Sequence, residues 1–442
     1  FLINLSFVFR IFIIGIPMYL VLFILLLNGF ILCEETLSVN KAMKIAATEN
    51  PGLLQSKADM DASFYNYWSV SSNMLPTVST GFTKIYNDEE ILLNFDGIII
   101  PLQPKTQWQK SVDVTIPLFT GGALYSAHKI ARKTESISRL VYDENLEKIK
   151  FETLEAYYNL VKMEGILEIT TSARDLIDKN IQMVEKMFDL GMVQKKDLLR
   201  AQVSAAEISQ QIQQAKQGVR ISILTLNMKM GKSLDSFYTL ETFIPEINEN
   251  RGLKDWVRSA FQNRPALQTA QTGVDIANWG YRASIGSALP SIAAIYHWED
   301  NSQSSGFSSE TSVERTMLNI SFEIPLGLSN VAKIGDAQAQ LRKSRYMAQE
   351  METGIRLQVE ANYLQYQLMY ESIELANQQL LAAEENYLAV ESGYENGESS
   401  QIELIDARNS LTNARINQIN MQIDHYISYN RLLFSCGETI GN

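Results

Sequence analysis

One order of proline and glycine positions occurs twice along the chain, and this repeat constrains the fold more than any other feature. Pro51 has a counterpart in Pro265 (265 − 51 = 214), and Pro76 has one in Pro290 (290 − 76 = 214). A period of this size is far longer than the roughly 20–50 residues of a solenoid module. Each copy is therefore expected to be a domain-sized unit, and the two copies to be similar halves of one object.

Later landmarks follow the same order at a slightly shorter offset. The segment 116–118 returns as 324–326 (324 − 116 = 208), and Gly191 returns as Gly397 (397 − 191 = 206). The copies are diverged but colinear, which predicts two structural repeats joined by a linker. The expected boundaries are 37–230 for the first repeat, 231–252 for the linker and 253–437 for the second repeat.

Charge and residue usage argue against several functional classes. The net charge of −12 disfavours a nucleic-acid binder, which needs a basic face to neutralise phosphates. The three histidines, His128, His297 and His425, lie far apart in sequence without ligand-like companions, and no phosphate-binding glycine loop occurs. We therefore expect no enzyme, no cofactor and no metal site.

The first residues are typical of an export signal. Arg10 precedes an uncharged stretch, 11–33, which is almost entirely apolar at first. We interpret 1–33 as a signal peptide that is removed on export. An uncleaved membrane anchor is the alternative, because the stretch could nearly span a bilayer. Lipid attachment at Cys33 is disfavoured by the bulky residues before it, and removal of the signal would leave Cys436 as the single cysteine.

Each repeat is expected to contain the same elements in the same order. A short helix ends at the residue before a proline, where the α conformation is disfavoured, and a second helix ends at a Leu-Pro step. A pair of strands and a long helical hairpin follow. The predicted ranges are 37–49 and 253–263 for the short helices, 52–73 and 266–287 for the second helices, 76–118 and 290–325 for the strand pairs, and 123–230 and 330–437 for the hairpins, with irregular loops at 87–109 and 299–314.

Alternation in the strands predicts a sheet with one apolar and one polar face. Leu318, Ile320 and Phe322 alternate with Asn319 and Ser321, which suits a sheet that is wet on one side only. Two strands alone are not stable in water, and four make a thin sheet. We therefore expect the sheet to be completed by other copies of the chain.

The helices of each hairpin are predicted to be very long. The stretches 123–188 and 332–394 contain no proline, which corresponds to helices on the order of 100 Å. A heptad spacing typical of coiled coils is visible in the first stretch, at Thr153, Ala156, Leu160, Met163 and Leu167. Further apolar residues lie off this seam, at Leu154, Tyr158 and Val161. A curved wall of helices and a solid bundle are both compatible with this pattern.

In its order of elements and its motifs, the region 37–437 resembles the TolC-like outer-membrane efflux protein family. The most specific motifs are the sequence IPLFTGG at 116–122, Tyr158 with Glu155 and Ala156 ahead of it, and the sequence DLLRAQ at 197–202, which follows Gly191. Each motif alone is weak, but their order, duplication and spacing together are fairly specific.

The resemblance implies a mainly α protein with a small β part. Three chains would form a helical barrel of twelve helical strands, continuous with a twelve-stranded transmembrane β-barrel to which each chain gives four strands. Such a homotrimer would lie in the outer membrane of a diderm bacterium and extend into the periplasm. It would passively conduct substrate from an inner-membrane transporter and a periplasmic adaptor, as the exit duct of a tripartite efflux or type I secretion system.

The resemblance also implies where function resides. Glu403 and Asp406 share one helix face at i, i+3 and would form two acidic rings at the narrowest point of the periplasmic entrance; a solvated helix face is the alternative. Asp197 and Tyr394 would help to hold neighbouring helices shut, and Ser399 departs from a basic residue found in some members. The residues expected to dock the adaptor are Leu190, Gly191, Met192, Asn396, Gly397 and Glu398.

Two other protein classes share some of these features. A periplasmic coiled-coil adaptor would also have a long hairpin and an export signal, but the duplicated hairpin with strand pairs favours a channel. A membrane-anchored structural protein would retain 11–33 uncleaved. The transported substrate and the partner transporter are not encoded in any recognisable motif.

Overall fold

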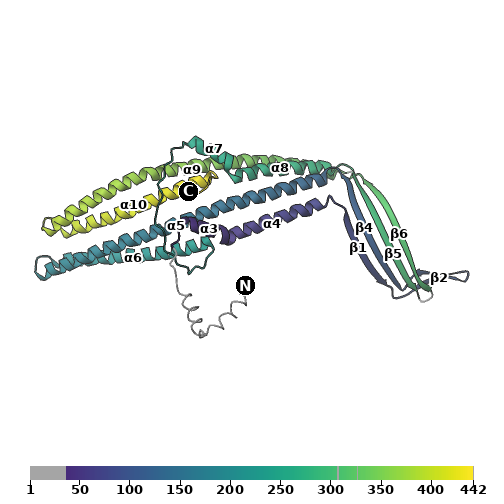
Figure 1. The fold of residues 1–442 in the computed structure, drawn as a ribbon, viewed down its shortest axis with the longest axis horizontal. Helices are drawn as coiled ribbons and strands as arrows, with labels where there is room; N and C mark the ends of the chain where they lie inside the picture. Colours follow the sequence, from purple (N-terminus) through teal and green to yellow (C-terminus); the bar gives the residue numbers. More distant parts are fainter. Residues whose placement is uncertain (1–35, 306–307, 326, 442) are drawn as a thin grey trace, which may run out of the picture.

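The computed structural model describes residues 36–305, 308–325 and 327–441. The expected signal peptide and Cys33 lie outside these residues. Two long helical hairpins extend from the middle of the molecule in one direction, and a curved sheet extends in the other (Figure 1). The molecule is therefore elongated, with the tips of the helical hairpins at one end and the sheet at the other.

The short helices of the two repeats follow the same rules. In the first repeat the side-chain oxygen of Asn50 accepts a hydrogen bond from the Leu53 N–H at 3.1 Å, which caps the second helix. Asn50 and Arg264 both have extended backbones (ψ 123° and 119°), as expected for residues before proline. The four helices are α3 (Val39–Glu49), α4 (Pro51–Ser72), α7 (Leu253–Asn263) and α8 (Pro265–Gly286).

Four strands form one antiparallel sheet in the order β1-β4-β5-β6. They are β1 (Thr77–Tyr86), β4 (Thr106–Thr120), β5 (Ser291–Ser305) and β6 (Ser308–Glu323). Strands β1 and β6 are the two edges of this sheet and pair on one side only. The register places Val114 opposite Tyr296, and Tyr296 opposite Leu318, on one apolar face. Asp113 and His297 pair on the opposite, polar face.

The prediction of an irregular loop at 87–109 was wrong for most of this stretch. This stretch contains a separate hairpin of β2 (Ile91–Phe95) and β3 (Ile98–Gln103), and β4 begins at Thr106. Its turn consists of Asp96 (φ 51°) and Gly97 (φ 88°). Positive φ at both central residues is the geometry that Asp-Gly favours in two-residue hairpins. The stretch expected to be irregular from 299 likewise continues β5 as far as Ser305.

The long helices match their predicted extents closely. They are α5 (Ala123–Asp189), α6 (Lys195–Met230), α9 (Leu328–Glu395) and α10 (Gln401–Ser435). Helices α4 and α6 both pack on α5, helices α8 and α10 both pack on α9, and α5 also contacts α8 and α10. The described helices thus lie side by side as a layer (Figure 1). The coiled-coil seam includes Thr153, Ala156 and Leu160, all buried.

The largest hydrophobic core lies where the short helices and the linker cross the long helices. Trp256 and Tyr157 are almost completely buried there. The Tyr157 hydroxyl donates a hydrogen bond to the Leu37 carbonyl (2.7 Å) and accepts one from the Glu241 N–H (3.0 Å). Burial raises the pKa of Tyr157 to about 12. Tyr157 therefore remains neutral, and its hydrogen bonds connect the linker to α5.

Candidate functional site at the helical tips

The two hairpins turn at their tips with the same backbone geometry. Gly191 and Gly397 have φ of 76° and 78°, in the left-handed region that glycine adopts without steric cost. Beyond Gly191 the Met192 N–H donates to the Met187 carbonyl at 2.8 Å, and beyond Gly397 the Glu398 N–H donates to the Gly393 carbonyl at 2.7 Å. These bonds close the ends of α5 and α9 as Schellman-type caps.

Each return helix begins with a reciprocal capping box. The Ser400 N–H donates to the Glu403 carboxylate at 2.6 Å, and the Glu403 N–H donates to Ser400 Oγ at 3.4 Å. In the other hairpin the Gln194 N–H donates to the Asp197 carboxylate at 3.3 Å. Asp197 and Glu403 occupy equivalent repeat positions (403 − 197 = 206), and each of these two predicted gate residues caps the helix that carries it.

The hydrogen bonds of this cap change the ionisation of Glu403. The Ser400 backbone N–H, followed by the Ser400 side chain, holds the pKa of the Glu403 carboxyl below its usual range. Glu403 therefore stays ionised to a lower pH than an ordinary glutamate. The negative charge also lies at the N-terminus of α10, where the helix dipole favours it.

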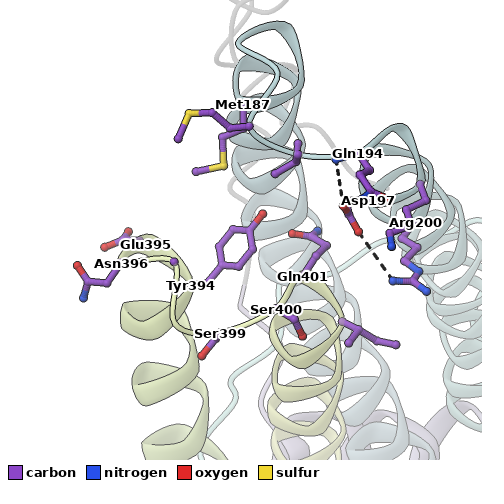
Figure 2. Close-up of a pocket in the computed structure, with 15 residues that line it drawn as sticks. Met187, Gln194, Asp197, Arg200, Tyr394, Glu395, Asn396, Ser399, Ser400 and Gln401 are labelled. Atoms are coloured by element: carbon purple, nitrogen blue, oxygen red, sulfur yellow. Dashed lines mark hydrogen bonds and ion pairs between the residues drawn. The ribbon is translucent and has the colours of Figure 1, made fainter.

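The two tips enclose a cleft of about 570 Å³, called the tip cleft below. Met187, Met192 and Val193 line it from the first hairpin, while Tyr394, Asn396 and Gln401 line it from the second. Figure 2 shows Tyr394 and Gln401 directed into the space between the hairpins, with Asp197 and Arg200 on the far side. The tip cleft thus brings together residues that are about two hundred positions apart.

Asp197 and Tyr394, expected to act together, both line the tip cleft. Tyr394 is only 8% exposed, and its hydroxyl has no hydrogen-bond partner among the described residues. Burial raises the pKa of Tyr394, and the nearby charge of Asp197 raises it further. The Asp197 carboxylate faces Arg200 at 3.8 Å.

Gln401 is a cleft residue that sequence analysis missed. Its side chain is 5% exposed, and neither its amide nitrogen nor its amide oxygen has a partner within the described chain. A glutamine at the first position of a helix is unremarkable in sequence. Only the packing of the other hairpin over it reveals that its polar atoms are buried and unpaired.

The remaining predicted site residues lie around the tip cleft. Asp406 is exposed on α10, whereas its neighbours Leu404 and Ala407 are buried against Val184 and Tyr387. Among the residues expected to dock a partner, Met192, Asn396 and Gly397 line the cleft, and Leu190, Gly191 and Glu398 lie outside its lining. Leu190 and Met192 are strongly exposed, at 75% and 69%.

Comparison with known proteins gives one consistent result. The family model described as outer membrane efflux protein matches residues 42–232 and 256–438. The chain is 19% identical over 419 residues to the outer membrane protein TolC of Escherichia coli (strain K12), covering 91% of this chain and 82% of the relative.

Solved structures show the same fold. The CmeC outer membrane channel of Campylobacter jejuni matches with a TM-score of 0.79 at 14% identity, covering 91% of this chain and 86% of that one. The open-state MtrE outer membrane channel of Neisseria gonorrhoeae matches with a TM-score of 0.75 at 15% identity, covering 91% and 89% of the two chains.

Proposed function

Because this chain belongs to the outer membrane efflux protein family, we propose that it is an outer-membrane exit duct that three copies must assemble to close. The resemblance drawn from the sequence is confirmed at the level of the family and of its mainly helical fold. The number of copies, the gate and the partners are proposals, and each is supported by features of the single chain.

The open sheet is the observation that carries this proposal. Strands β1 and β6 are long edges without a second neighbour among the described strands, and such edges favour pairing with another chain. Successive strands of the sheet are antiparallel, so β6 of one copy can pair with β1 of the next without breaking the alternation. Three copies would close a barrel of twelve strands.

The apolar face of the sheet supports a location within a membrane. Val78, Phe82, Leu318, Ile320 and Phe322 all lie on this face and are between 61% and 72% exposed. Apolar residues outside and polar residues inside are the pattern of transmembrane barrels. No helix within the described ranges combines the length and apolarity that a membrane span needs.

The helices present matching apolar surfaces at the two sides of the layer. The exposed leucines on α9 include Leu357, Leu364, Leu368, Leu375 and Leu388. On the other side, α4 exposes Leu54, Tyr65 and Trp68, and α6 exposes Leu199, Val203, Ile221 and Met228. The first four leucines are spaced 7, 4 and 7 residues apart, which suits a coiled-coil seam. We propose that α9 of one copy packs against α4 and α6 of the next copy.

The helical tips would form the periplasmic entrance of this duct. We propose Asp406 and Glu403 as acidic rings around the pore, with Asp197 and Tyr394 at the contact between hairpins. A periplasmic adaptor would dock at the tips and connect the duct to an inner-membrane transporter. The duct itself makes and breaks no bonds in this proposal; opening requires only that the hairpins move apart.

Conductance of the purified protein tests this function directly. We expect wild-type protein inserted from one side of a planar lipid bilayer to give discrete, cation-preferring channels, because acidic rings attract cations. The control is protein unfolded before addition. Absence of discrete channels from natively folded protein would contradict the proposal.

A further inference from the structure

A histidine lies between two carboxylates on the polar face of the sheet. The Nδ1 atom of His297 on β5 is 2.5 Å from the carboxylate of Asp113 on β4, and its Nε2 atom is 3.5 Å from the carboxylate of Glu299. We call these three residues the histidine cluster. Strands β4 and β5 are the two central strands of the sheet, so the cluster lies at the opposite end of the molecule from the helical tips (Figure 1).

Hydrogen bonds from neutral side chains hold one of the carboxylates in place. Glu299 Oε1 accepts from the side-chain amides of Gln109 (2.7 Å) and Asn301 (2.6 Å). The side chains of His297 and Glu299 remain 22% and 13% exposed. The histidine cluster is therefore fixed in position and still accessible from the polar side of the sheet.

The charges that face His297 come from three strands. Asp113 lies on β4 and Glu299 on β5, and Arg315 on β6 lies opposite Glu299 in the register. The residues of β1 on this face, 77, 79, 81, 83 and 85, carry no charge. A protonated His297 together with Arg315 balances the two carboxylates. A neutral His297 leaves one net negative charge per chain.

We propose that His297 makes the ion selectivity of the β-barrel depend on pH, as a second selectivity ring remote from the acidic rings at the tips. The inference rests on the proposed function, in which the polar face of the sheet lines the lumen, as in transmembrane barrels. In three copies, neutral His297 side chains would leave a ring with one net negative charge per chain. Such a ring attracts cations, and a balanced one does not.

The pH range separates this ring from the tips. Histidine ordinarily changes its charge between about pH 5 and pH 8, whereas aspartate and glutamate ordinarily titrate near about pH 4. A change of selectivity between about pH 5 and pH 8 is therefore a signature of histidine rather than of the acidic rings.

The histidine cluster occurs once per chain. At the offset of the two proline steps, the positions equivalent to His297 and Glu299 in the first repeat are Thr83 (297 − 214 = 83) and Ile85 (299 − 214 = 85). Neither carries a charge. A trimer would therefore have three such clusters at one level of the barrel, and not six.

The test measures the reversal potential of single channels in a salt gradient at about pH 5 and about pH 8. His297→Gln keeps a polar side chain that is neutral at both pH values, and His297→Arg keeps a positive charge at both. The control is His128→Gln. His128 lies on α5, where its Nδ1 atom is 2.9 Å from the Ser71 hydroxyl of α4, and it has no part in the sheet.

We expect the wild type to prefer cations more strongly at the higher pH. The ratio of cation to anion permeability should differ roughly two- to fivefold, the scale for a few unit charges screened by water and salt. His297→Gln should show the high preference at both pH values, and His297→Arg the low preference at both. His128→Gln should behave as the wild type does.

A wild-type selectivity that does not change between the two pH values would overturn this inference, as would an unaltered pH dependence in either His297 variant. Loss of the pH dependence in His128→Gln would also overturn it. These outcomes leave the proposed duct intact, because each is measured on open channels. Natively folded wild-type protein that gives no channels would instead refute the duct itself, and with it this inference. A variant that gives discrete channels has folded, so either His297 variant is sufficient for the test.

Discussion

Glu403 and Asp406 were both expected to form acidic rings at the entrance, but their surroundings indicate different roles. Both residues are exposed, but Glu403 caps the helix that carries it through the Ser400 N–H, while Asp406 lies one turn further along, outside this cap. A side chain that satisfies a helix terminus contributes to folding wherever the tip lies. We therefore expect stability to depend on Glu403 and ion selectivity to depend mainly on Asp406.

The stability of the tip should depend on the ionisation of Glu403. Because its pKa is lowered in the folded chain, the cap contributes fully above the ordinary carboxyl pKa and is lost as pH falls through the folded value. We expect Glu403→Ala to lower the melting temperature at neutral pH, and the difference to vanish in acid. Asp406→Ala, which removes a carboxylate that caps no helix terminus, is the comparison. Equal effects of the two changes would contradict the cap.

Selectivity should show the opposite dependence. Asp406→Ala is expected to reduce the preference for cations and to raise single-channel conductance, because it removes one charge per chain from the proposed ring. The measurement is the reversal potential across a planar bilayer in a salt gradient. Asp336→Ala, a change remote in sequence from the tips near the start of α9, is the comparison. An unchanged reversal potential in Asp406→Ala would remove this residue from the gate.

At the scale of elements, the turns at the two tips require glycine because their backbone has positive φ. An added Cβ would meet no atom within 4 Å at Gly191 or Gly397, so their positive φ is the only obstacle to another residue. We expect Gly191→Ala and Gly397→Ala each to destabilise the hairpin by about 1–2 kcal/mol, the cost of the left-handed conformation. Chemical unfolding followed by circular dichroism measures the loss.

Gly354 provides the matched control for the tips. It lies inside α9, has open space around its Cα and does not have positive φ. Alanine there should stabilise the helix by about 0.5–1 kcal/mol. If alanine destabilised all three positions equally, crowding or another general effect would explain the result better than backbone conformation.

The sequence was sufficient to predict most elements and insufficient for the cleft. Proline steps, heptads and alternation report local geometry, so α5, α9 and the four sheet strands could be predicted. The β2–β3 hairpin was missed because its apolar residues lie in a stretch bounded by acidic residues and proline, which was interpreted as an irregular loop. Gln401 was missed because its burial depends on the packing of the other hairpin, which no local pattern encodes.

At the scale of the molecule, a single chain has unpaired strand edges and exposed apolar surfaces that a working duct would need to cover. Among the described residues the sheet has two free edges, the helical layer exposes apolar seams on both sides, and the apolar face of the sheet is open to solvent. Large exposed apolar surfaces mark sites of association with proteins or membranes. Closure by copies of the same chain satisfies the edges and the seams together, and lipid covers the sheet face.

The number of copies tests this account most directly. Native mass spectrometry of the purified protein, released from mild detergent micelles, counts the chains in each intact particle. The account predicts particles of three chains, which separate into monomers only when the helical seams are disrupted, for example by Leu364→Glu with Leu368→Glu. A stable population of single, folded chains in the wild type would contradict the duct.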